Sequence, residues 1–510
     1  MKKFILIIFI FVISIFGIFY MLFFTKIGNS TISKYIENSF NEKQNDFKLK
    51  FDTFIIDTNN INLVANINLV ANINDSSKVK IDGKINSLFD LKAEFIYKID
   101  IKDLSIFNNI VQKELKGSLQ ANGDLITKNG LSTIIGTSNI ANSSTKYEIN
   151  LNKTDIKSLD LDIKNANIDE LLALLSEPIY SFGKLNLNAK LIKNSSNFFN
   201  GDFLFDINDG KINNEIVQKE FNFPIKQTIT YNLKSLNKLE NTNVLSDIKL
   251  ISSLANLDMK NLIIDLVTKD ISSNYFLDIL NLRQIEEFIN IALNGDLKVA
   301  GNINKNQKTL KIDGNSNIAD GVANFVLLDD NLDLKLKDAN SLKLLYILNK
   351  DQFFNSNLSL DSNYNIISKI GNINIEVKNG NFIKNNFIQK IEDFTKIDLS
   401  KEIFESGTIN SKIDNKKIYS NLNLTSKKSD IKSKDSFIDF NKNIIDTKLD
   451  INLNKNIFSV KLEDDLNKPK IIVDVQDLIK NILEKKLDKY INKEDDAQKI
   501  ELLKGIKSLF

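Results

Sequence analysis

The sequence of 510 residues predicts a mainly β protein: an elongated, antiparallel, repeating β-groove with short crossover helices, an N-terminal transmembrane helix and C-terminal helices. Three observations lead to this prediction. One stretch of the chain is duplicated, apolar and polar residues alternate along most of it, and short helical segments recur at equivalent places. Repeated units that each expose an apolar face bury it only against a neighbour, so such chains grow in one dimension.

The duplication relates residues 99–219 to residues 277–390. Gly117 falls on Gly295 in the second copy, and the run Ser-Asn-Ile-Ala that follows it recurs at the same offset. Each copy contains a smaller unit twice, which reads as a strand, a short helical segment and a Gly-x-Leu-x-Leu strand or a near variant. A repeated unit of this size indicates a modular fold.

Apolar residues alternate with polar ones through most of residues 47–475. Every second residue from Ile61 to Ile73 is Ile, Leu or Ala, with asparagine recurring between them. Such alternation is typical of strands with one buried face and one wet face. The dipeptides Asn129-Gly130, Asp209-Gly210 and Asn379-Gly380 predict tight hairpins. We therefore expect an antiparallel meander of roughly two dozen strands over this region.

Helical spacing appears at equivalent places in the two copies. Residues 168–175 and residues 342–348 each carry a broad apolar face. We expect these segments to cross from one strand set to the next or to cover part of an open sheet. Residues 476–510 also show helical spacing, which predicts a C-terminal helical cap with a second helix from about Gln498. This basic end either caps the last repeat or touches an anionic lipid surface.

The N-terminal run Phe4–Phe24 is apolar and, as a helix, long enough to cross a bilayer of roughly 30 Å. Two lysines precede it, so the N-terminus is expected to stay cytoplasmic. A cleavable signal peptide is the alternative, although Thr25–Gly28 makes a poor cleavage site. We predict an uncleaved anchor in residues 1–26. A short amphipathic helix in residues 27–46 then either lies on the membrane surface or caps the first end of the array.

Composition argues against several classes of function. The chain has no Cys, His or Trp, which excludes Cys/His zinc sites, a Ser-His-Asp triad, a Cys nucleophile and a histidine general base. Its 67 basic and 65 acidic residues nearly balance, so nothing points to nucleic acid. Asp206–Gly210 resembles a calcium loop only loosely, because it lacks the ligand spacing and the distal Glu. We expect no enzyme activity, no metal and no cofactor.

A long sheet that is apolar on one face has to hide that face, and a trough would leave a continuous apolar channel. The cargo that fits such a channel is a chain-like apolar molecule, namely the acyl tails of phospholipids. Nine alternating residues are predicted to line it: Leu185, Leu187, Leu191, Leu297, Val299, Ile303, Ile373, Ile375 and Val377. A dry core between two sheets is the alternative, and it requires the same alternation.

The chain resembles the AsmA-like family of repeating β-groove proteins. The features that carry the resemblance are the N-terminal anchor with its short helix, the strands opened by Gly117, Gly183 and Gly295, and the closing segment from Asp464 to Phe510. The resemblance implies the fold called a β-taco. It also implies a protein anchored in the inner membrane of a diderm bacterium by Phe4–Phe24, with the bulk of the chain in the periplasm.

The same resemblance implies a role in phospholipid transport or outer-membrane lipid homeostasis, with phospholipids and outer-membrane or other envelope proteins as partners. The alternative function is a structural or assembly factor for outer-membrane proteins that carries no lipid. Such a factor would use open sheet edges to template strands.

Overall fold

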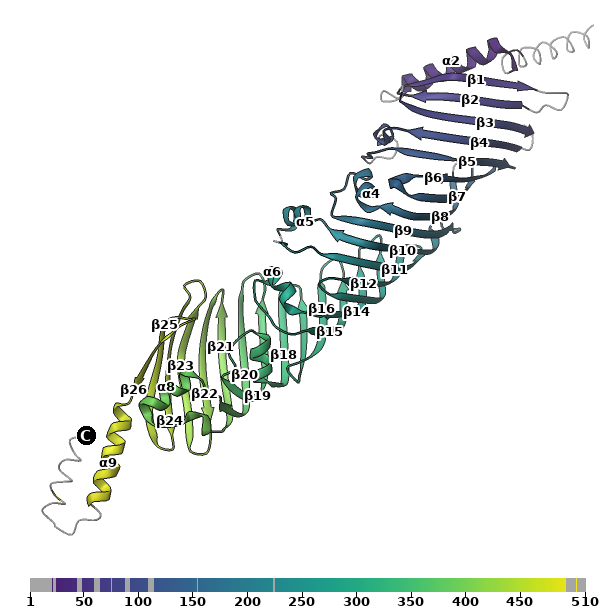
Figure 1. The fold of residues 1–510 in the computed structure, drawn as a ribbon. Coiled ribbons are helices and arrows are strands. Elements are labelled where there is room, and N and C mark those ends of the chain that lie inside the picture. Colours follow the sequence, from purple (N-terminus) through teal and green to yellow (C-terminus); the bar gives the residue numbers. More distant parts are fainter. Residues whose placement is uncertain are drawn as a thin grey trace, which may run out of the picture. The chain divides into compact units, whose positions relative to one another are not determined.

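The computed structural model describes residues 21, 24–43, 48–58, 65–74, 76–87, 92–108, 114–153, 155–222, 225–491 and 501. The chain divides into two compact units, Met1–Lys269 and Asp270–Phe510, which are described separately. Figure 1 shows that both are built from long antiparallel strands with short helices beside them. The prediction of a mainly β antiparallel fold is confirmed.

Unit 1 begins with a helix and continues as a meander of strands. Its elements are α2 (Lys26–Lys43), β1 (Leu49–Thr58), β2 (Ala65–Ile73), β3 (Ser77–Ser87), β4 (Lys92–Ile101), η1 (Leu104–Phe107), β5 (Leu119–Lys128), β6 (Leu131–Ser138), η2 (Ile140–Asn142), β7 (Ser144–Asn152), β8 (Asp155–Asn167), α4 (Ile168–Leu174), β9 (Ser181–Lys193), β10 (Phe199–Ile212), α5 (Asn214–Phe221), β11 (Thr230–Glu240), β12 (Asn243–Ser252) and β13 (Asn256–Asp265).

Unit 2 is built in the same manner, and its last described element is a helix. Its elements are β14 (Ile271–Ile279), η3 (Leu282–Ile285), α6 (Glu286–Ile289), β15 (Leu297–Lys305), β16 (Leu310–Ile318), β17 (Gly321–Leu328), β18 (Asn331–Asn340), α7 (Ser341–Ile347), β19 (Phe354–Asn365), β20 (Ile370–Phe382), α8 (Asn386–Thr395), η4 (Leu399–Lys401), β21 (Phe404–Asp414), β22 (Lys417–Thr425), β23 (Ser429–Asp439), β24 (Ile444–Leu453), β25 (Asn456–Asp465), β26 (Lys470–Asp474) and α9 (Gln476–Ile491).

Within each unit, each strand pairs with the next one in sequence, always antiparallel. The connections alternate between the two ends of the strands. Where the connections are described, odd strands lead to even strands through short turns, whereas even strands lead to odd strands through helices or short loops. The described helices between strands therefore lie at one end of the strands of their unit, which we call the helix end.

The duplication is visible in the backbone of the two copies. Gly117 and Gly295 both have positive φ, +91° and +87°, which a residue with a Cβ rarely adopts. The amide of Lys116 donates to the carbonyl of Leu174 at 2.9 Å, and the equivalent amide of Asn294 donates to that of Ile347 at 2.9 Å. The helices α4 and α7 are therefore tied to the same neighbouring loop in each copy.

Two of the three predicted hairpin dipeptides are β-bulges. Asn129-Gly130 does form the turn between β5 and β6. Asp209-Gly210 lies inside β10, where the register of both neighbouring pairs shifts, and Asn379-Gly380 lies inside β20. Asp209 and Asn379 have φ of +53° and +51°. A tight hairpin and a β-bulge both need a residue with left-handed φ. The dipeptide alone therefore does not distinguish a hairpin from a bulge.

The helix α2 covers the free edge of β1. Glu37 Oε1 accepts the Phe51 amide at 2.6 Å, and Asn41 Oδ1 accepts the Leu49 amide at 2.7 Å. Asn29 Nδ2 donates to the Ile56 carbonyl at 2.9 Å. Side chains thus replace the missing neighbouring strand, a common protection for edge strands. Of the two predicted roles for this short helix, capping the first end of the array is confirmed.

The predicted anchor lies almost entirely outside the described residues, since only Met21 and Phe24 of Phe4–Phe24 are described. Where the chain is described, no helix has the length and apolar character needed to cross a membrane. At the other end, α9 forms as predicted after the strand β26. The second C-terminal helix, predicted from about Gln498, also lies outside the described part of the chain apart from Glu501.

Candidate functional site

The strands separate an apolar face from a polar face. On β20, Asn372, Asn374 and Glu376 are exposed, whereas Ile373 and Ile375 are half-buried. The same alternation occurs on β15 and β18. Because side chains on a strand point alternately to opposite faces, the apolar residues of successive strands fall side by side. Leu187, for example, lies opposite Ile163 on β8 and Phe205 on β10.

The nine predicted lining residues all lie on strands β9, β15 and β20. Val299 and Val377 are 7% and 5% exposed. The other seven are half-buried: Leu185, Leu187, Leu191, Leu297, Ile303, Ile373 and Ile375. A half-buried leucine or isoleucine keeps some apolar surface that no protein atom covers. Leu185, Leu187 and Ile375 also pack against buried clusters, whereas Leu191, Leu297, Ile303 and Ile373 belong to none of these clusters.

One row of this face runs across neighbouring strands next to the helix end, and we call it the helix-side row. Its members in unit 1 are paired by register and are Leu185, Ile207, Leu233, Leu250 and Leu257. Its members at the equivalent positions of unit 2 are Leu358, Val377, Gly407, Leu424 and Ile431. The five residues of unit 1 are all half-buried, whereas the five of unit 2 are all buried.

The connecting helices of unit 2 contribute to this difference, α7 at Leu358 and α8 at Leu424 and Ile431. Ile388 and Ile391 of α8 have no exposed surface and pack with Leu424, Ile431 and other buried residues in one apolar cluster. The cluster also contains Leu399, Phe404, Ile451, Leu453, Phe458, Val460 and Leu478. The apolar face of β20–β25 is therefore covered by α8, by the 3-10 turn η4 and by the start of α9.

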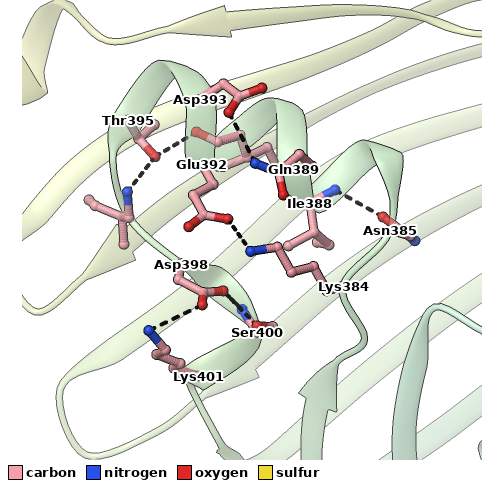
Figure 2. A network of polar contacts seen from close by, with 12 residues as sticks. Lys384, Asn385, Ile388, Gln389, Glu392, Asp393, Thr395, Asp398, Ser400 and Lys401 are labelled. Atoms are coloured by element: carbon pink, nitrogen blue, oxygen red, sulfur yellow. Dashed lines mark hydrogen bonds and ion pairs between the residues drawn. The ribbon is translucent and has the colours of Figure 1, made fainter.

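Polar contacts on the other side of α8 hold it in place (Figure 2). Asn385 caps the helix by accepting the amide of Ile388 at 2.9 Å. Lys384 Nζ lies 2.8 Å from Glu392 Oε2 and forms an ion pair with it. The Glu392 carboxylate raises the pKa of Lys384 through this hydrogen bond. The helix therefore presents two isoleucines to the sheet, and an ion pair ties its Glu392 to Lys384, which precedes the helix.

The helices α4 and α7 each cover only part of the apolar face, next to the clusters named below. Leu171 of α4 packs against the cluster of Ala141, Ile163 and Ala166. Leu344 and Ile347 of α7 pack in the same way in unit 2 against the cluster of Ala319, Leu336, Ala339 and Leu358. Both helices were predicted from sequence, and their predicted role in covering part of an open sheet is confirmed.

A pair of tyrosines forms a polar spot on the apolar face of unit 1. The hydroxyl oxygens of Tyr97 and Tyr147 are 2.7 Å apart. Gly136 makes room for them, because a Cβ at this position would lie 2.3 Å from Tyr97 Oη. Burial raises the pKa of Tyr97 well above its usual range, and the hydrogen bond to Tyr147 raises this pKa further. The hydroxyl of Tyr97 therefore stays neutral at physiological pH.

A second polar spot in unit 1 is a hydrogen-bonded group of three side chains. Asn237 Oδ1 accepts from Ser235 Oγ at 2.7 Å and from Ser246 Oγ at 2.6 Å, and Asn237 Nδ2 donates to the Phe203 carbonyl at 3.1 Å. The group interrupts an otherwise apolar row, and our sequence reasoning missed it. The signal was available, because Ser235 and Asn237 occupy inward positions of an alternating strand.

The opposite, polar face carries exposed ion pairs such as Lys190 with Asp160 at 3.0 Å. Pairs of this kind contribute at most about 1 kcal/mol each and mainly keep the face wetted. A depression of about 480 Å³ on this face is lined by Asn122, Asp124, Lys146 and neighbouring residues. It is open and charged, and Asn122, Asp124 and Lys146 belong to the face opposite that of Leu185, Leu187 and Leu191 of the same unit.

No protein-family model, no curated protein and no solved structure matches this chain. The function is therefore inferred from the side chains on the two faces of the sheet. The apolar face offers an uncharged surface, broken by a few neutral hydroxyl and amide groups and partly covered by short helices. Such a surface can hold apolar chains through burial alone, without covalent chemistry.

Proposed function

We propose that the apolar face of the repeats is a groove that binds or conducts the acyl chains of phospholipids. The protein would thereby support outer-membrane lipid homeostasis from an anchor in the inner membrane. The observation that carries the proposal is the half-burial of seven of the nine candidate residues. Apolar side chains in register across many strands, left partly uncovered, form the surface that an apolar chain needs for burial.

The anchor, the periplasmic location and the membership of the AsmA-like family belong to this proposal too. They rest on the sequence resemblance and on the apolar run Phe4–Phe24. The assembly-factor alternative requires an accessible sheet edge for templating strands. The edge of β1 does not offer one, because Glu37 and Asn41 of α2 already occupy its backbone groups.

The test is mass spectrometry of an organic extract of the full chain, purified after production in a bacterial envelope. Stoichiometric phospholipid in the extract is the expected result. A folded chain that carries no lipid would overturn the proposal and favour the assembly-factor alternative.

Two variants refine this test. Leu187→Glu places a carboxylate on a half-buried part of the face, so it should remove lipid and leave the fold intact. Val299→Glu places the same charge at a position that is only 7% exposed, so it should unfold its module. Loss of folding in both variants would instead indicate a dry core throughout.

A further inference from the structure

The two copies of the repeat differ in the element that follows β10 in unit 1 and β20 in unit 2. The C-cap residues that follow the two helices, Asn222 after α5 and Lys396 after α8, both have left-handed φ, +56° and +58°. When the two helices are aligned by these C-caps rather than by the sequence repeat, Asn214 and Val217 of α5 take the places of Ile388 and Ile391 of α8. Both isoleucines of α8 are completely buried, whereas α5 has no buried residue.

Asn214 in α5 is polar where Ile388 in α8 is apolar, and this favours the packing of α8 against the sheet over that of α5. An amide side chain needs hydrogen-bond partners when it leaves water, whereas an isoleucine gains free energy from the same move. Asn214 Nδ2 donates to the Gln227 carbonyl at 2.8 Å, which holds it in its own loop rather than on the strands. The helix-side row of unit 1 consequently stays half-buried at Leu233, Leu250 and Leu257.

We infer that the apolar face of β10–β13 in unit 1 is a seat for the acyl chains of one phospholipid, and that α8 fills the equivalent seat of unit 2 as a built-in substitute for lipid. This inference rests on the proposed function. In unit 2 the seat accepts the apolar side of a helix, an object about 10 Å across. The strands that form the seat in unit 1 pair in the same register, with Leu233 in the place of Gly407 and without a buried helix above them.

The occupant is an apolar chain rather than a charged or polar ligand. The residues around the seat are Phe205, Ile207, Leu233, Ile248, Leu250 and Met259, and all are uncharged and half-buried. The polar group nearest in register is the Ser235 and Asn237 network, whose hydroxyls and amide are bound to one another. The seat therefore gives a ligand burial and offers no counter-charge.

Photocrosslinking compares the two seats directly in the full chain. A photoreactive amino acid replaces Leu250 in one variant and Leu424 in another, and each is exposed to phosphatidylethanolamine vesicles before illumination. We expect lipid adducts at position 250 and about tenfold fewer at position 424. A tenfold ratio in lipid occupancy corresponds to the burial free energy of about one leucine side chain. Equal labelling at the two positions would overturn the inference while leaving the proposed function standing.

Exchanging the helix residues supplies the reciprocal test. Asn214→Ile should let α5 seat and reduce labelling at position 250, whereas Gln218→Ile adds the same side chain at an exposed position of α5 and should change nothing. Ile388→Asn should raise labelling at position 424. If that variant does not fold, the Asn214→Ile and Gln218→Ile pair decides. An unchanged yield with Asn214→Ile overturns the inference, and absence of labelling at every position overturns the proposed function as well.

Discussion

The strands β10–β13 of unit 1 and β20–β23 of unit 2 pair in matching register, yet the helix-side row is half-buried in the first set and buried in the second. Leu250 in unit 1 and Leu424 in unit 2 are the same residue at equivalent register positions, yet Leu250 is half-buried and Leu424 is 4% exposed. The strands contribute to this difference, because Gly407 stands where unit 1 has Leu233. The connecting segment adds to it, through the two buried isoleucines of α8 and through Leu399 of η4.

The comparison shows that alternation along a strand does not determine whether a face is a core or a binding surface. Both copies alternate, and both would be dry cores if each had an apolar helix to cover it. Part of what distinguishes them lies in the even-to-odd connections, where α8 is amphipathic and α5 is more polar. Function in such a repeat can therefore change through a few connection residues while the sheet is kept.

The strongest way to break the comparison is to place a charge at equivalent positions. Ile431→Glu buries a carboxylate at a residue that is 1% exposed, which should abolish the cooperative unfolding transition of unit 2. Leu257→Glu, its counterpart in unit 1, should leave the circular dichroism spectrum and the melting curve nearly unchanged. If both variants unfold to the same extent, the face of unit 1 is as closed as that of unit 2.

Truncation of the matched leucines should have the next largest effect. Leu424→Ala should reduce the free energy of unfolding by about 3 kcal/mol, because it leaves a cavity in the cluster under α8. Leu250→Ala should cost about 1 kcal/mol, since its side chain is only partly covered. Urea denaturation of the two variants measures both values, and equal losses would contradict the distinction.

The helix caps sharpen the comparison at a smaller scale. Asn385 caps α8 through its side chain, whereas Asn213 at the start of α5 makes no such bond. Asn385→Ala should therefore lower the stability of unit 2 by about 1 kcal/mol, while Asn213→Ala should change little. Thermal unfolding followed by circular dichroism would show this, and a larger loss for Asn213→Ala would be the opposite of what we expect.

The smallest expected effect concerns the ion pair on α8. Glu392 raises the pKa of Lys384 in the folded chain above its unfolded value of 10.5. The stabilisation is therefore complete below pH about 10.5 and is lost as pH rises through the folded pKa. The melting temperature should fall more steeply above this pH in the wild type than in Glu392→Gln. Identical alkaline profiles would show that the ion pair has no role in seating α8.

The sequence predicted the faces of the sheet well, because a period of two leaves little freedom in which residues share a face. It also located α4, α7 and α9, whose apolar residues recur at helical spacing. It did not predict which half-repeat is filled. Val377 in unit 2 and Leu185 in unit 1 were treated alike, although Val377 is buried and Leu185 is half-buried, since burial depends on contacts between segments that are distant in sequence.

The bulges at Asp209 and Asn379 and the hydrogen-bonded Asn237 group escaped prediction for related reasons. A left-handed residue followed by glycine suits both a hairpin and a bulge, and only the neighbouring strands reveal which one forms. A buried asparagine is tolerated because two serine hydroxyls reach its oxygen, and one of them, Ser246, is on the next strand. Such pairings depend on register, which local sequence patterns do not specify.

The most direct test of the account is native mass spectrometry of the intact full-length chain, recorded for the wild type and for Leu250→Glu. The account predicts phospholipid adducts on the wild-type chain and fewer adducts on Leu250→Glu, with both proteins folded. A wild-type chain without adducts, or a Leu250→Glu chain that keeps every adduct, would contradict it.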